Sequence, residues 1–351
     1  MNLRPSERVR VVVVEDSLVQ RAHLVRTLEA EGDITVVGQA EGAQEAASLV
    51  HELRPDVVTL DLHIPEGGGR YAIEQIMGHS PTPILVLSAA VESRESDSAV
   101  EALVAGAVDA LPKPKRWTEA DEAMVRDRVR ALRGVTVVRH PRGRRPSAGS
   151  QGSTMPGGPR ASHLHHVVGL AASTGGPPAL AEVLGGLDGL AAPVLVVQHL
   201  HADFVEGLVE WMARATSLSV RLARDGEPVE PGGVYIGPGG LHLRIDAERR
   251  IELRPDPTTL HRPSANELFL SLARHVGADA IGALLTGMGD DGAAGLLAMR
   301  HAGGVTIAQD RETCAVYGMP RAALANGAVT TPVPLNQVAR AIRRATVGVA
   351  A

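Results

Sequence analysis

Short aliphatic and β-branched runs alternate with amphipathic segments in two separate stretches of this chain. The first run, VRVVVVE (9–15), is almost continuously apolar, which is typical of a strand buried on both faces of a sheet. Four further runs of this kind follow within residues 9–133, and a segment with helical spacing of apolar residues succeeds each one. Five strand–helix units in succession predict a flavodoxin-like α/β domain, in which helices cover both faces of a five-stranded parallel sheet.

A second alternation begins near residue 164 and continues toward the end of the chain. Its long apolar runs, and the short strands and turns between them, predict a doubly wound, mostly parallel α/β domain. The stretch between the two alternations is rich in Gly, Pro, Ser and Arg, a composition typical of a flexible linker. We therefore expect a first domain over residues 1–133, a linker over 134–163 and a second domain over 164–351.

The composition excludes several classes of function. Aromatic residues make up only 2% of the chain and the net charge is -5, which argues against a nucleic-acid-binding surface. The single cysteine, Cys314, permits no internal disulfide and fits a reducing compartment. The four valines near the N-terminus form too short an apolar run for a signal peptide or a membrane span. We expect a soluble cytoplasmic protein that does not insert into membranes.

Polar side chains stand at the carboxyl ends of the strands predicted in the first domain. Glu15 and Asp16 end the first strand, Asp61 ends the third, Ser88 ends the fourth, and Lys113 follows the fifth. Parallel strands place these ends on one edge of the sheet, where ligands bind. A divalent cation such as Mg²⁺ would offset the repulsion of three carboxylates, and Asp61 could then accept a phosphoryl group. Helix capping explains one such acid, but not matching residues at four strand ends.

Residues 9–125 resemble a response-regulator receiver domain through VVVVED, TLDLHIP, LSA and LPKP. The resemblance implies transfer of a phosphoryl group from a histidine kinase to Asp61, with Ser88 and Lys113 as switch residues. It also implies a Mg²⁺ ion held by Asp16, Asp61 and the backbone carbonyl of His63, with Glu15 nearby.

The segment GLAASTGGPPAL (169–180) carries an exposed-looking serine, Ser173, between an apolar strand and a helix. Small residues and Gly175 around the serine resemble the strand–turn–helix turn that presents a nucleophile, and the helix N-terminus would offer N–H groups to an oxyanion. A phosphate cradle is disfavoured, because neither a Walker lysine nor GxGxxG is present.

A nucleophilic serine needs a base and a group that orients the base. His199 ends the next predicted strand, VVQHL, and Asp291 follows a further one, LLTGMGDDG, so both should reach the same sheet edge as Ser173. A metal-dependent hydrolase is an alternative, because His199 and His201 share one face of an extended segment. The spacing favours the Ser–His–Asp arrangement, since no third cluster of ligands accompanies the two histidines.

The second half of the chain resembles the catalytic domain of the chemotaxis protein-glutamate methylesterases, the CheB family. The matching stretches include GLAASTGGPPAL, VVQHL, LLTGMGDDGAAGL and VYGMPRAAL. The resemblance implies hydrolysis of γ-methyl esters on glutamates of methyl-accepting chemoreceptors, deamidation of receptor glutamines, and no cofactor for the esterase reaction. It places the family's catalytic residues on Ser173, His199 and Asp291, and makes the N–H groups of Thr174 and Met288 oxyanion candidates. A response regulator whose second domain signals without catalysis is the remaining alternative.

Overall fold

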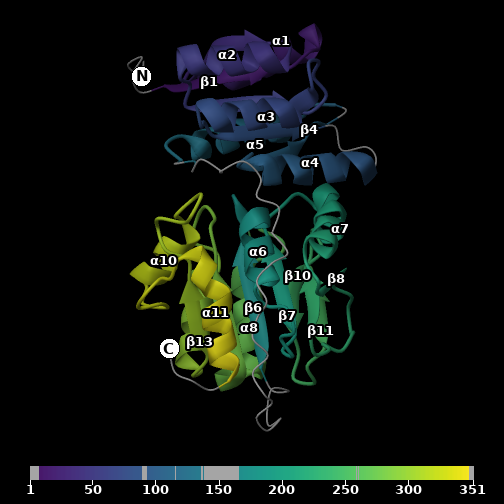
Figure 1. Cartoon of the computed structure of the whole chain (residues 1–351), viewed down its shortest axis with the longest axis vertical. Helices are drawn as coiled ribbons and strands as arrows, with labels where there is room; N and C mark the ends of the chain where they lie inside the picture. Colours follow the sequence, from purple (N-terminus) through teal and green to yellow (C-terminus); the bar gives the residue numbers. More distant parts are fainter. Residues whose placement is uncertain are drawn as a thin grey trace, which may run out of the picture.

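The computed structural model describes residues 8–88, 93–114, 116–135, 137, 166–257, 259 and 261–347. The predicted linker, 134–163, lies almost entirely outside these residues. The chain folds into two α/β units that stack on one another along the long axis (Figure 1).

The first unit is built on a five-stranded parallel sheet with the strand order β2-β1-β3-β4-β5. Its strands are β1 (Val9–Val14), β2 (Ile34–Ala40), β3 (Val57–Asp61), β4 (Ile84–Ser88) and β5 (Asp109–Pro112). Its helices are α1 (Leu18–Glu29), α2 (Ala43–Leu53), α3 (Gly68–His79), α4 (Ser93–Ala105) and α5 (Glu119–Leu132). The predicted flavodoxin-like architecture is confirmed.

The second unit holds a six-stranded parallel sheet with the order β13-β12-β6-β7-β9-β8, and a two-stranded antiparallel pair. The sheet strands are β6 (Val167–Ala172), β7 (Val194–Gln198), β8 (Ser219–Leu222), β9 (Gly233–Ile236), β12 (Ala280–Leu284) and β13 (Val305–Ala308), and the pair is β10 (His242–Ile245) with β11 (Ile251–Arg254). The helices are α6 (Gly176–Gly185), η2 (Ala202–Phe204), α7 (Val205–Ala215), α8 (Ala265–His275), η3 (Gly277–Asp279), α9 (Ala293–His301), α10 (Met319–Ala325) and α11 (Leu335–Thr346). The predicted doubly wound, mostly parallel domain is also confirmed.

The strand orders determine where each sheet can build a site. In the first sheet, β1 lies between β2 and β3, so the chain crosses to opposite sides of β1 in its first two connections. In the second sheet, β6 lies between β7 and β12. The carboxyl ends of parallel strands form a crevice where the winding direction reverses, and this is where ligands bind in open α/β sheets.

The first unit covers the carboxyl edge of the second sheet, and α4 packs on α7, α6 and η2 (Figure 1). Val100 of α4 belongs to a buried apolar cluster made mostly of residues of the second unit, and Phe204 belongs to one made mostly of residues of the first. The backbone N–H of Gly175 donates to the carbonyl of Val108 at 3.3 Å. A cavity of about 470 Å³ remains between the units, lined by Val108, Gly175 and Thr286 among others.

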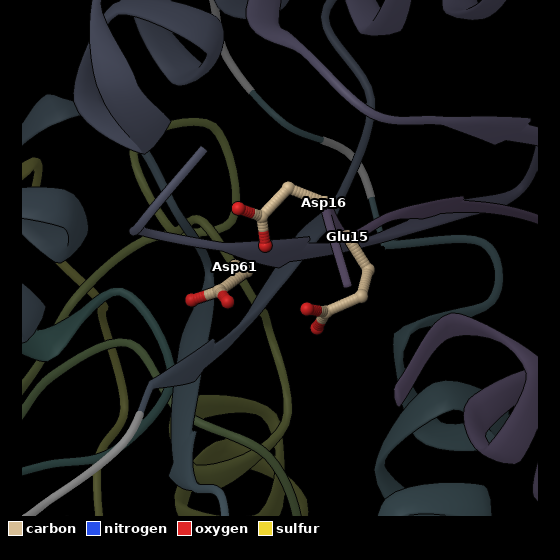
Figure 2. A group of neighbouring side chains, drawn as sticks. All are labelled: Glu15, Asp16 and Asp61. Carbon is tan, nitrogen blue, oxygen red and sulfur yellow. The ribbon is translucent and has the colours of Figure 1, made fainter. Parts of the chain in front are cut away.

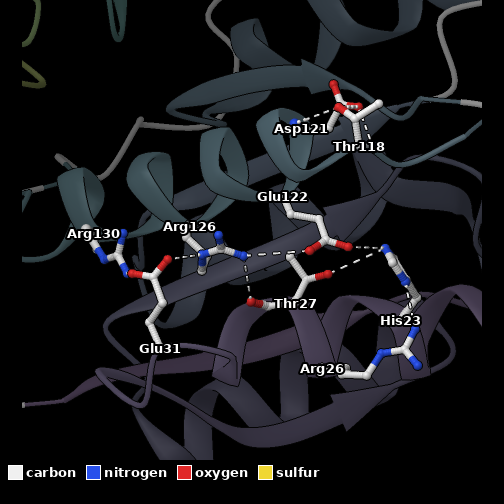
Figure 3. Close-up of polar contacts among 9 residues, drawn as sticks. All are labelled: His23, Arg26, Thr27, Glu31, Thr118, Asp121, Glu122, Arg126 and Arg130. Atoms are coloured by element: carbon white, nitrogen blue, oxygen red, sulfur yellow. Dashed lines mark hydrogen bonds and ion pairs between the residues drawn. The ribbon is translucent and has the colours of Figure 1, made fainter.

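Helix α5 is held on α1 by a network of charges (Figure 3). Arg126 and Arg130 both contact Glu31 just beyond α1, at 2.9 Å and 2.5 Å, and Glu122 lies 3.4 Å from His23. The helix starts with a capping box, in which the Thr118 hydroxyl accepts from the backbone of the third helical residue. These contacts fix α5, and with it the side chains that α5 presents to the second unit.

Candidate functional site

Three carboxylates meet at the crevice of the first sheet, as the strand ends predict. Glu15 and Asp16 follow β1 directly, and Asp61 is the last residue of β3. One carboxylate oxygen from each lies within 4.8 Å of the others, and the three groups surround a common space (Figure 2). Glu15 and Asp61 are buried, whereas Asp16 is exposed. Hard oxygen donors with one open side match what Mg²⁺ requires, so these residues fit the cation predicted for this site.

Lys113 reaches the same carboxylates from the end of β5. Its ammonium donates to Asp61 Oδ2 at 2.5 Å and to Glu15, and its side chain is almost fully buried. Burial raises the pKa of Glu15, and the hydrogen bond and charge of Lys113 oppose that rise. The Ser88 hydroxyl is buried at the end of β4 with no hydrogen-bond partner among the described residues. The backbone N–H of His63 donates to Asp61 Oδ1 at 3.2 Å. The structure therefore brings Glu15, Asp16, Asp61 and Lys113 together, with Ser88 at the end of the adjacent strand.

Ser173 is the first residue after β6, and its backbone is held from both sides. Its N–H donates to the carbonyl of Thr286 at 3.0 Å, and its carbonyl accepts from the Gln198 side chain and the Gly176 N–H, both at 2.8 Å. Residues after β12 and at the end of β7 thus fix the turn between β6 and α6. The serine backbone cannot shift without breaking bonds to both neighbouring strands.

The turn differs from the strained turn that presents a nucleophile in α/β-hydrolases. There the serine itself is strained, whereas here the left-handed residue is Gly175, with φ 72°, and Ser173 does not have a positive φ. Gly287 lies against the serine, because a Cβ at Gly287 would come within 2.7 Å of Ser173 Cβ. Close packing, and not backbone strain, presents this side chain.

His199 follows β7 and bonds to Asp291 from the loop after β12. The distance from Nε2 to Asp291 Oδ2 is 2.9 Å, and the histidine side chain is only 4% exposed. The other ring nitrogen, Nδ1, is buried and has no hydrogen-bond partner among the described residues. Because Asp291 accepts the proton on Nε2, the tautomer present leaves a lone pair on Nδ1. His199 and Asp291 follow the strands on either side of β6, so both lie at the sheet edge where β6 ends and Ser173 begins.

Asp291 is held at the N-terminus of α8. Its carboxylate accepts from the Ser264 hydroxyl at 2.8 Å and from the backbone N–H groups of Ala265 and Asn266 at 2.7 Å and 3.0 Å. Ser264 is the N-cap residue of α8 but makes no cap bond of its own, so Asp291 satisfies the free N–H groups of the first turn. The partial positive charge of a helix N-terminus stabilises an ionised carboxylate.

These contacts keep Asp291 ionised. Burial by itself would raise the pKa of Asp291, but the hydrogen bond and charge of His199, with the bonds from Ser264 and Asn266, hold it well below its usual range. A fixed negative charge beside Nε2 stabilises a histidine that takes up a proton at Nδ1. The pair can therefore act as an oriented general base.

The metal-hydrolase alternative is not favoured by this geometry. Nε2 of His199 is used by Asp291, and Nδ1 of His201 contacts its own neighbour Asp203, whose carboxylate lies 3.4 Å away. Among the described residues, the cluster of three or more potential metal ligands is the one at Glu15, Asp16 and Asp61, and it includes neither histidine.

The two oxyanion candidates have free backbone donors. Within the described part of the chain, the N–H groups of Thr174 and Met288 donate to no protein acceptor, and the Thr174 hydroxyl is buried without a partner. Such groups are rare in folded proteins and are available to a substrate oxygen.

Two residues of the first unit lie close enough to interact electrostatically with this site. Burial raises the pKa of Asp109, at the start of β5, and the charges of Arg128 and His199 partly oppose that rise. Arg128 of α5 lies 3.5 Å from Asp109. The sequence did not predict that Asp109 and Arg128 lie near this site, because their position there depends on how the two units stack.

Sequence analysis also missed Gln198, Ser264 and His261. Gln198 is adjacent to His199, and its position at a strand end was a usable signal. Ser264 and His261 precede a helix in the segment HRPSANELF, where a serine is an ordinary cap residue and the histidine has no special spacing. The His261 ring stacks on His199 with centroids 4.2 Å apart and planes 13° apart.

Comparisons with known proteins agree with this organisation. Residues 11–124 match the family model of the response regulator receiver domain, and residues 168–342 match that of the CheB methylesterase. A protein-glutamate methylesterase/protein-glutamine glutaminase of Anaeromyxobacter dehalogenans (strain 2CP-C) is 43% identical over 351 residues, covering 99% of this chain and all of the relative. One of Myxococcus xanthus (strain DK1622) is 42% identical, covering 95% of this chain and 96% of the relative. The solved catalytic domain of Thermotoga maritima CheB is 33% identical, with a TM-score of 0.49, and covers 50% of this chain and 96% of that domain.

None of the helices in the described residues combines the length and apolar character that crossing a bilayer requires.

Both family models, and relatives matched from end to end, give the same family assignment. The chain belongs to the family of protein-glutamate methylesterase/protein-glutamine glutaminases, in which a response-regulator receiver domain precedes a CheB methylesterase domain.

Proposed function

We propose that this protein is a phosphorylation-activated serine hydrolase that removes γ-methyl esters from glutamates of methyl-accepting chemoreceptors and deamidates receptor glutamines. The observation that carries the proposal is the bond from His199 Nε2 to Asp291, which leaves a buried Nδ1 lone pair at the sheet edge where Ser173 stands. The names of the relatives supply the substrate class.

Ser173 Oγ attacks the ester carbonyl carbon while its proton passes to His199 Nδ1. The carbonyl π electrons move onto oxygen, which the N–H groups of Thr174 and Met288 stabilise. The C–O bond to the methoxy group then breaks, and methanol leaves with the proton from Nδ1. Water gives a proton to Nδ1 and attacks the acyl carbonyl carbon. The bond from that carbon to Ser173 Oγ then breaks, Oγ takes the proton back from Nδ1, and glutamate is released. With glutamine as substrate, ammonia leaves in place of methanol.

Ser173 and His199 share no hydrogen bond in the closed arrangement described here, since no contact joins Oγ to Nδ1. Catalytic hydrogen bonds are often long in resting enzymes and shorten when substrate binds. We infer that substrate binding brings Ser173 Oγ within hydrogen-bond distance of His199 Nδ1.

In the receiver domain, Asp61 accepts a phosphoryl group from the phosphohistidine of a chemosensory histidine kinase. Mg²⁺, when bound, offsets the negative charge there, and Asp16, Asp61 and the His63 carbonyl would hold it, with Glu15 nearby. Lys113 neutralises the acceptor carboxylate, to which it already donates. Ser88 has a hydroxyl without a partner and can donate to the phosphoryl oxygen.

The receiver restrains the esterase in the unphosphorylated state. The bond from Gly175 to Val108 and the packing of α4 on α7 support this proposal. We place the receiver at residues 1–133, the linker at 134–163 and the esterase at 164–351. We also propose that the protein acts in the cytoplasm, without membrane insertion or nucleic acid, and that the esterase reaction uses no cofactor.

The test is release of methanol from a methylated chemoreceptor fragment, with Mg²⁺ and a small phosphodonor present. Release by the intact protein that Ser173→Ala abolishes supports the proposal, and ammonia release from the unmodified glutamine form tests deamidation. Full activity of Ser173→Ala would overturn the serine mechanism. Absence of release from any methylated receptor would favour a signalling role without catalysis.

A further inference from the structure

The loop between β11 and α8 contributes a second histidine to the site that the proposed mechanism does not use. The ring of His261 lies face to face with that of His199, with centroids 4.2 Å apart and an angle of 13° between the planes. The described residues give the His261 ring no hydrogen bond, so its contact with the site is the stacked face itself. Offset or parallel ring contacts of this kind restrict the orientation of both rings.

The loop that carries His261 is held in place on both sides. The buried His242 side chain donates from Nε2 to the carbonyl of Pro257 at 2.7 Å and accepts at Nδ1 from the N–H of Ser264 at 3.1 Å. The N–H of Gly240 donates to the carbonyl of Arg262 at 3.1 Å. The same short segment therefore presents the His261 ring to His199 and the Ser264 hydroxyl to Asp291.

His199 is thus restricted in two independent ways. Asp291 fixes one edge of its ring at Nε2, but a single hydrogen bond leaves the ring free to rotate about that contact. The flat face of His261 removes this freedom, because rotation of His199 would drive its ring into the stacked one. A base whose lone pair is kept pointing at its proton donor avoids the large rate losses that small misplacements cause.

We propose that His261 is a positioning residue for the esterase reaction, which holds the ring plane of His199 by stacking so that Nδ1 faces Ser173. The inference rests on the proposed function, because it assigns His261 a part in that same site. Burial, followed by the nearby charge of His199, lowers the pKa of His261 to about 4, so the stacked ring is neutral at ordinary pH. A neutral ring does not repel the imidazolium formed at His199.

The experiment compares His261→Ala, which removes the ring, with His261→Phe, which keeps a flat ring but has no nitrogen. The control is His301→Ala, an exposed histidine at the end of α9. Methanol release by the full-length protein is measured with phosphodonor and Mg²⁺, giving kcat, KM and the pH profile of kcat/KM. Thermal unfolding establishes that each variant is folded.

We expect kcat of His261→Ala to fall about tenfold or more with KM little changed, as for a misplaced catalytic group. The acidic limb of the kcat/KM pH profile of His261→Ala should move to higher pH. Water would replace the stacked ring over the His199 imidazole and solvate the imidazolium better. His261→Phe should stay within about threefold of the unchanged protein and keep its pH profile. The control should behave as the unchanged protein does.

Two results would overturn the inference. An unchanged kcat and pH profile for His261→Ala would show that stacking has no part in the reaction. Equal loss in His261→Phe and His261→Ala would show that a ring nitrogen is required, and not a flat face. Failure of the proposed function would give a different result. The unchanged protein would then release no methanol, or it would release methanol that Ser173→Ala does not abolish.

Discussion

The backbone N–H of Gly175 donates to the carbonyl of Val108 at 3.3 Å, and this bond joins the turn after Ser173 to the residue that precedes β5. β5 is only four residues long, and Lys113, the residue after it, donates to Asp61. One short strand thus links the phosphorylation site to the nucleophile turn. We expect a change in the contacts of Lys113 to reach Gly175 through this strand.

Loosening the contact between the domains should raise activity without phosphorylation. Val100 of α4 is buried in a cluster made mostly of esterase residues, so Val100→Asp places an unpaired charge there and favours separation. We expect methanol release without phosphodonor to rise about fivefold or more, and the response to phosphodonor to shrink. Glu101→Gln, at an exposed position of the same helix, is the control. Unchanged basal activity in Val100→Asp would contradict a restraining role for this interface.

Asp291→Asn should leave the fold intact and lower kcat by about 10²–10⁴-fold, because the amide neither holds the same tautomer of His199 nor stabilises its protonated form. The neighbouring Asp290→Asn is the matched control, since Asp290 is exposed. Steady-state methanol release measures both. Equal kcat values for the two variants would remove Asp291 from the mechanism.

The Asp291→Asn variant also gives a prediction for how stability depends on pH. The pKa of Asp291 is lowered on folding, so its ionised form stabilises the native state above the unfolded pKa of about 3.9, and this contribution is lost as pH falls through the lowered folded pKa. The difference in unfolding free energy between the unchanged protein and Asp291→Asn should be constant above about pH 5 and decrease below about pH 4. Denaturant titrations at several pH values measure it. A difference that grows on acidification would have the wrong sign.

Ser264→Ala removes a hydroxyl that donates to the Asp291 carboxylate at 2.8 Å. A hydrogen bond to a charged group contributes about 1.5–3 kcal/mol, so we expect a loss of that order in unfolding free energy and a smaller loss of kcat than in Asp291→Asn. Ser264→Thr, which keeps the hydroxyl, should recover most of both. No recovery in the threonine variant would place the effect in packing and not in the hydrogen bond.

Mg²⁺ should bind the receiver and leave the unstimulated esterase unaffected. Binding to the native state adds about 2.7 kcal/mol of stability at a free concentration of about 100 times Kd, which thermal unfolding detects. Asp16→Asn should reduce the stabilisation by Mg²⁺. Asp127→Asn, at the position of an exposed acid on α5, should not. A chelator should abolish the response to phosphodonor but not basal methanol release. Loss of basal release on chelation would contradict the serine mechanism.

The strand ends explain how much of the site the sequence could predict. Ser173 and His199 each follow a strand directly, as do Glu15 and Asp16, and Asp61 is the last residue of its strand, so the rule for parallel sheets locates all of them. Asp291 stands seven residues beyond β12, and its position depends on the bonds it makes at the N-terminus of α8. Those bonds join Asp291 to Ala265 and Asn266, which lie 26 and 25 positions earlier in the chain. A local sequence pattern does not extend over such a separation.

The parts that could not be predicted depend on how surfaces meet. Asp109 and Arg128 are ordinary strand and helix residues until the receiver covers the esterase. His261 becomes part of the site only because His242 holds its loop against the sheet edge. Which ring nitrogen of His199 bonds to Asp291 is likewise a matter of three-dimensional approach.

We propose that phosphorylation of Asp61 exposes a reactive Ser173, which is buried while the receiver covers the esterase. The most direct measurement is the rate at which a small serine-directed fluorophosphonate labels the full-length protein, with Mg²⁺ and with or without a beryllium fluoride phosphate mimic. We predict that the mimic accelerates labelling, that Asp61→Asn removes the acceleration, and that Ser173→Ala removes labelling. Equal labelling rates with and without the mimic, or labelling that persists in Ser173→Ala, would contradict the account.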